Sequence, residues 1–162
     1  MNKVKLTDES IMANTLIVAV FNTLGTAEKA CQDFKDFAEK DDGFTIHSGV
    51  VVGKDDSGAL TILDRQTRSY WGTAIGALSG ALIGMLGGPV GSVLGFTAGA
   101  SAGLAGHALR TLLDSEFVKA VSAKLRPGTA AVILEADEAS PFAVDNVVNG
   151  YGGSVHRKAF PE

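Results

Sequence analysis

The stretch WGTAIGALSGALIGMLGGPVGSVLGFTAGASAG, residues 71–103, carries glycine at every fourth position along two successive segments. Residues four apart lie on one face of a helix, so each series predicts a helix with one smooth face. Such small-residue stripes let two backbones approach closely, above all in membranes. Because each glycine costs an isolated helix about 1 kcal/mol relative to alanine, close packing must offset that cost. The predicted packing residues are Gly72, Gly76, Gly80, Gly84, Gly88, Gly91, Gly95, Gly99 and Gly103.

The segment that holds these glycines lacks ordinary charges. From Trp71 to Leu109 it contains no Asp, Glu, Lys or Arg, and His107 is its only titratable side chain. Gly87-Gly88-Pro89 divides it, because glycine permits turn geometry and proline suits the first turn of a new helix. The pattern predicts a helical hairpin over about 71–86 and 89–108. A hairpin of this composition exposes more apolar surface than a monomer usually shows, so it requires partners.

A lipid bilayer is one environment that fits the hairpin. The first leg would be about 24 Å long and the second about 31 Å at ~1.5 Å per residue, against the ~30 Å of a bilayer core. Tyr70 and Trp71 lie at its start, where aromatic belts occur, and Arg65, Arg68 and Arg110 flank both ends on the same side. This interpretation predicts a protein on the cytoplasmic side of the inner membrane.

Two alternatives to the membrane hairpin remain open at this point. In the first, the protein is a cytoplasmic homo-oligomer, a ring, cage or filament, and the hairpins of several subunits form its core. Small polar residues such as Thr73, Ser79 and Ser92 make the legs only moderately apolar, which favours this reading. In the second, the protein is a small-ligand-binding plait with a pocket between its sheet and its helices.

The rest of the chain has the pattern of a soluble α+β domain. The run NTLIVAVF, residues 14–21, predicts a buried central strand. A helix capped by Thr26 and ending at Asp41-Asp42-Gly43 follows it. The remaining elements are strands at 45–52 and 60–63 around a turn at 55–58, a helix at 115–125, a strand at 129–135, a helix after Ser140-Pro141 to about Asn149, and a strand at 153–159.

This order of elements predicts a ferredoxin-like plait with a helical hairpin inserted after its third strand and an extra αβ unit at the C-terminus. We expect short helices on one face of a four- or five-stranded sheet. The predicted organisation is a polar segment at 1–13, an α+β domain at 14–69 and 110–162, and the glycine-rich insertion at 70–109.

Several stretches of the chain together resemble one bacterial protein family. They are LIVAVF at 16–21 with TAEKA at 26–30, GALSGALIGMLGGPVG at 76–91, FVKAVSAKLRPGTAAVILE at 117–135, and YGGSVHRKAF at 151–160. The chain is similar to the domain of unknown function 1269, whose members are often labelled predicted membrane proteins. The resemblance implies the fold and a membrane label, and it brings no known activity and no catalytic residues.

Composition and motifs narrow the classes of function. The 162 residues carry a net charge of −4, which gives no electrostatic support for nucleic-acid binding. The single cysteine, Cys31, falls on the inward face of its helix, and we expect a buried structural thiol there. His47, His107 and His156 have no metal-binding spacing, and neither a P-loop nor GxGxxG is present. We therefore expect no metal, no cofactor and no catalytic residue, and a non-enzymatic protein that self-assembles through its glycine ladders.

Overall fold

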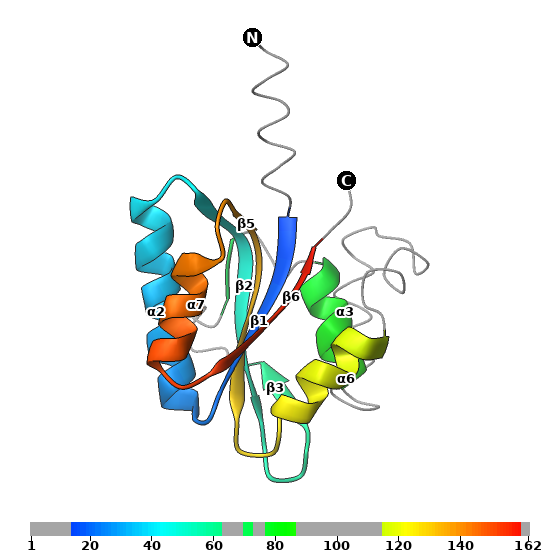
Figure 1. Ribbon diagram of the computed structural model, residues 1–162. Coiled ribbons are helices and arrows are strands. Elements are labelled where there is room, and N and C mark those ends of the chain that lie inside the picture. Colours follow the sequence, from blue (N-terminus) through cyan, green and yellow to red (C-terminus); the bar gives the residue numbers. More distant parts are fainter. Residues whose placement is uncertain (1–13, 63–69, 73–76, 87–114, 160–162) are drawn as a thin grey trace.

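The computed structural model describes residues 14–62, 70–72, 77–86 and 115–159 of the chain, which form an α+β structure (Figure 1). The strands are β1 (Asn14–Phe21), β2 (Phe44–Lys54), β3 (Leu60–Ile62), β4 (Tyr70–Gly72), β5 (Ala130–Glu138) and β6 (Ser154–Ala159). The helices are α2 (Leu24–Lys40), α3 (Ala77–Leu86), α6 (Ser115–Lys124) and α7 (Phe142–Gly150).

The strands form one sheet in the order β3-β2-β5-β1-β6, and β4 pairs with β2 as well. Every pair is antiparallel. Val18 of β1 and Val50 of β2 both lie opposite Ile133 of β5, so these three strands form the centre of the sheet. The predicted buried strand at 14–21 is confirmed, and its residues from Leu16 to Phe21 are at most 5% exposed.

Helices cover both faces of this sheet (Figure 1). Helices α2 and α7 bury one face around Phe21 and Phe34, and α3 and α6 bury the other around Val18 and Val121. The expectation of helices on a single face is therefore wrong. The reason lies in β1, because side chains alternate between faces along a strand and both alternating sets of β1 are apolar. A strand of this kind is buried only when both of its faces are covered.

The start of the predicted hairpin is extended rather than helical. Tyr70, Trp71 and Gly72 form β4 and pair with Val50, Gly49 and Ser48 of β2. The predicted first leg at 71–86 is therefore wrong at its beginning, and the described helix α3 starts at Ala77. Strand β3 covers one side of β2 only at Val52 to Lys54, so the free edge of β2 before Val52 offers unpaired backbone groups to an extended segment beside it.

Three local expectations are resolved by hydrogen bonds. Helix α2 is capped by Thr23, whose hydroxyl accepts from the Thr26 N–H at 3.1 Å, so the predicted cap at Thr26 is wrong by three residues. The predicted turn at 55–58 is present, and Asp55 there accepts from the backbone N–H groups of Ser57 and Ala59. The helix predicted after Ser140-Pro141 is present as α7, which begins at Phe142, and the Ser140 hydroxyl accepts from the Phe142 N–H at 3.3 Å.

Helices α2 and α7 lie side by side in opposite directions on their face of the sheet (Figure 1). The Tyr151 hydroxyl, just beyond the end of α7, donates to Asp33 in the middle of α2 at 2.7 Å. The other end of the pair brings the last turn of α2 to the first turn of α7. That end is where a cavity opens.

Candidate functional site

Helix α3 is the part of the predicted glycine-rich insertion that the structure describes as a helix. Its side chains Leu82, Ile83 and Leu86 are 0%, 3% and 9% exposed, and they join one apolar cluster with Phe117 and Val121 of α6. The same cluster includes residues of β1, β2 and β5. The apolar side of α3 therefore packs on the sheet of its own chain.

The predicted packing glycines fall in several different places. Gly80 and Gly84 lie in α3, and Gly84 is buried. Gly72 lies in β4, so it belongs to a strand and not to the predicted helical ladder. The glycines outside the described residues are Gly76, Gly88, Gly91, Gly95, Gly99 and Gly103, together with the second predicted leg. Within the described part of the chain, no helix is long and apolar enough to cross a membrane.

A row of polar side chains lies on the two neighbouring strands β2 and β5. Ser48 is buried and its hydroxyl donates to Glu135 Oε2 at 3.3 Å, while His47 Nε2 lies 2.9 Å from Asp137 Oδ2. In a Ser-His-Asp relay, a histidine is bonded to the serine hydroxyl. Ser48 bonds to a carboxylate instead, so these four side chains do not form such a relay.

His156 is the second described histidine, and it lies on β6 as the sequence predicts. Its Nε2 atom is buried without a hydrogen-bond partner among the described residues. Burial lowers the pKa of His156 below its ordinary value of 6.5, and the charge of Lys124 lowers it further. Both effects favour the neutral form of the imidazole. The third histidine, His107, lies outside the described residues.

Cys31 is buried on the inner side of α2, as expected from its position in the helical pattern. Burial raises the pKa of its thiol from 9.0 to about 11. The thiolate is the reactive form of cysteine. This side chain consequently behaves as an apolar core residue.

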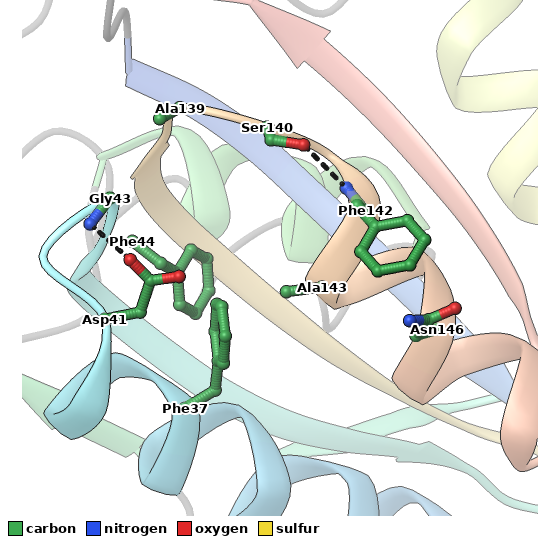
Figure 2. A pocket seen from close by; sticks show the side chains of 9 residues that line it. All are labelled: Phe37, Asp41, Gly43, Phe44, Ala139, Ser140, Phe142, Ala143 and Asn146. Carbon is green, nitrogen blue, oxygen red and sulfur yellow. Dashed lines mark hydrogen bonds between the residues drawn. The ribbon is translucent and has the colours of Figure 1, made fainter.

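A cavity of about 420 Å³ opens where the last turn of α2 meets the first turn of α7 (Figure 2). Phe37 and Asp41 come from the end of α2, Phe44 from the start of β2, and Phe142 and Asn146 from α7. The Phe37 and Phe44 rings have centroids 5.5 Å apart and form the apolar wall. Apolar cavities of this size with a few polar groups are the usual form of small-molecule sites.

The spacing of the cavity residues in the sequence is consistent with this cavity but does not predict it. Phe142 and Asn146 are four residues apart and lie on one face of α7, while Asp41 follows Phe37 by the same spacing but is the first residue after α2. The sequence indicated only that Asp41-Asp42-Gly43 ends α2. Which two helix ends meet depends on the pairing of strands, which these local spacings do not reveal.

A metal site is not formed by the described part of the chain. Within residues 14–62, 70–72, 77–86 and 115–159, no group of three or more His, Cys, Asp or Glu side chains is placed to hold an ion.

Comparison with known proteins places the second part of the chain in a family. The family model described as "Protein of unknown function (DUF1269)" matches residues 71–161. No curated protein and no solved structure gives a match.

Proposed function

The chain belongs to the family of proteins of unknown function DUF1269, and we propose that it is a non-enzymatic protein that assembles with copies of itself through its uncharged insertion. The observation that carries this proposal is the burial of α3. Leu82, Ile83 and Leu86 are covered by the sheet and α6 of the same chain. The insertion is thereby attached to the domain at a fixed place, and the uncharged residues that follow α3 in sequence are left to make the contacts between subunits.

The fold that fits this arrangement is a ferredoxin-like plait. Four strands in the order β6-β1-β5-β2 and two antiparallel helices, α2 and α7, correspond to the two βαβ halves of that fold. In this assignment β5, α7 and β6 supply the second half, so the C-terminal αβ unit belongs to the plait. The insertion then follows the second strand of the plait, in place of the third strand expected from the element order.

The second leg of the predicted hairpin carries the contacts in this proposal. Pro89 to Leu109 contains Gly91, Gly95, Gly99 and Gly103 and no Asp, Glu, Lys or Arg. If helical, it would extend about 31 Å at ~1.5 Å per residue, which is close to the ~30 Å of a bilayer core. We propose that these helices contact one another in one of two environments. They form either the protein core of a cytoplasmic oligomer or a membrane-associated assembly on the cytoplasmic side of the inner membrane.

The test of the proposal is the mass of the assembly. We expect the natural chain to have a light-scattering mass several times the 16.7 kDa of one chain. The double variant Gly95→Leu, Gly99→Leu should fall toward the mass of one chain. Gly25→Leu is the matched control, because Gly25 lies exposed on α2 with no heavy atom within 4 Å of an added Cβ. A natural chain that is already monomeric, or a double variant with unchanged mass, contradicts self-assembly through these glycines.

High-speed centrifugation of a lysate without detergent separates the two settings. Recovery in the supernatant, with the mass unchanged by detergent, identifies an oligomer with a protein core. Recovery in the pellet, with release of a defined oligomer by detergent, identifies association with the bilayer.

A further inference from the structure

The cavity between α2 and α7 is lined by both aromatic rings and polar side chains (Figure 2). The end of α2 contributes Phe37 and Asp41, and the start of α7 contributes Phe142 and Asn146. In α7 the ring of Phe142 is followed one turn later by Asn146, and in α2 the ring of Phe37 is followed by Asp41 at the C-cap. Phe44 lies between them at the start of β2.

Phe142 is unusually exposed for a residue of its kind. It is 69% exposed at the rim of the cavity, whereas Val144 and Val148 of the same helix are buried. Apolar surface left in water is unfavourable in free energy. The described fold does not need this ring for its core, and a ligand in the cavity would cover it.

Asp41 is the one charged residue among those that line the cavity. Its backbone N–H donates to the Phe37 carbonyl at 3.0 Å, and its Oδ1 accepts from the Gly43 N–H at 2.7 Å. These two bonds fix the carboxylate. The other oxygen, Oδ2, has no hydrogen-bond partner among the described residues and points away from Gly43, to the side where the Phe37 and Phe44 rings lie (Figure 2).

We infer that this cavity binds a small organic ammonium ion with an apolar body. The ammonium group bonds to Asp41 Oδ2, and the apolar body extends along the rings of Phe37, Phe44 and Phe142. Aromatic faces attract cations, and a carboxylate strengthens the selection of positive charge. A carboxylate ligand of the same shape is repelled by Asp41.

Three probes that differ only in their head group test this inference on the full chain. They are 2-phenylethylammonium, 2-phenylethanol and 3-phenylpropanoate, and their binding is followed by saturation-transfer NMR, which also works for large assemblies. We expect the ammonium probe to bind at least tenfold more tightly than the alcohol, and the carboxylate probe to bind most weakly. Equal affinity for the ammonium and alcohol probes, or binding of none of the three, overturns the inference.

Two variants locate the site. Asp41→Asn keeps an oxygen that accepts from Gly43 N–H, so the turn is retained, and we expect the affinity for the ammonium probe to fall to that for the alcohol. Asp42→Asn is the matched control, because this neighbouring carboxylate does not line the cavity, and it should leave all affinities unchanged. An equal loss in both variants would mean general attraction to an acidic surface, and it contradicts a defined site.

Phe142→Ala gives an independent test that does not depend on the turn at Asp41. The position is exposed, so the fold should be retained, and circular dichroism checks it. We expect the affinities for the ammonium and alcohol probes to fall by a similar factor of about three to ten, because both probes share the apolar body. Unchanged affinity for both probes would show that they bind elsewhere.

Discussion

Arg157 of β6 binds Glu138 of β5 through two hydrogen bonds, from Nε to Oε2 and from Nη2 to Oε1. The same guanidinium donates from Nη1 to Asp145 Oδ1 at 2.8 Å and from Nη2 to the Pro141 carbonyl at 3.2 Å. One side chain thus connects β6, the end of β5 and the first turn of α7. Burial by itself would lower the pKa of Arg157, but the hydrogen bonds to Glu138 and Asp145 outweigh it and raise that pKa.

The first prediction concerns the shape of this guanidinium. Arg157→Lys keeps the positive charge but cannot form two parallel bonds to Glu138. Because the Glu138 side chain is only 6% exposed, we expect the free energy of unfolding to fall by about 2 kcal/mol, the usual value of hydrogen bonds to charged groups. Arg126→Lys, at an exposed position, should change it by less than about 0.5 kcal/mol in the same urea titration. Equal effects of the two variants would mean that the paired bonds add no stability.

The second prediction compares two glycines near the end of α7. A Cβ added at Gly153 would lie 2.6 Å from the Val20 carbonyl oxygen and 2.8 Å from the Phe21 ring, whereas one added at Gly150 meets no heavy atom within 4 Å. We expect Gly153→Ala to destabilise the protein by about 2 kcal/mol through overpacking. Gly150→Ala should stabilise it by about 0.5 kcal/mol by restricting the unfolded chain. Thermal unfolding of both variants measures the difference, and a tolerated Gly153→Ala would contradict the close approach of β1 and this turn.

The third prediction is a pH dependence at His156. Its pKa in the folded protein lies below 6.5, so well above pH 6.5 the histidine is neutral in both states and contributes little to the pH dependence. As the pH falls below 6.5, the unfolded chain takes up a proton that the folded chain resists, and stability falls until the folded pKa is passed. We expect His156→Leu to reduce this loss between pH 6.5 and 5.

Urea titrations at pH 7.5, 6.5, 5.5 and 5 give the comparison. The same slope with pH in the natural chain and in His156→Leu would show that another group is responsible.

The central strands could be predicted from sequence patterns, whereas the elements that cover them could not. The run at 14–21 is apolar at every position but two, which is the pattern of a strand buried on both faces. That run also requires cover on both faces. The helices that supply the second cover, α3 and α6, lie more than fifty residues away along the chain, and local spacing does not identify them.

The short strand β4 and the aromatic cavity could not be predicted from the sequence for a similar reason. Tyr70 and Trp71 are typical both of a membrane boundary and of a strand, and only the free edge of β2 decides between them. In α7 the residues Phe142, Val144 and Val148 are all apolar, yet Phe142 alone of the three is exposed. The choice depends on how α7 lies beside α2, which is a property of the whole sheet.

The fourth prediction asks whether α3 belongs to the domain or to the subunit interface. Leu82 is fully buried against the sheet, while Met85 of the same helix is 50% exposed. If α3 is part of the domain, Leu82→Ala creates a cavity and should lower the free energy of unfolding by about 3 kcal/mol. Met85→Ala should change it by less than about 0.5 kcal/mol.

A second readout makes this comparison decisive, because a helix that leaves the sheet to join a bilayer or another subunit would respond differently. In that case Leu82→Ala would change the light-scattering mass of the assembly and leave the unfolding of the α+β domain as it was. We expect the opposite result, a less stable domain in an assembly of unchanged mass. The contacts between subunits would then come from residues after α3, since Leu82, Ile83 and Leu86 are already buried within their own chain.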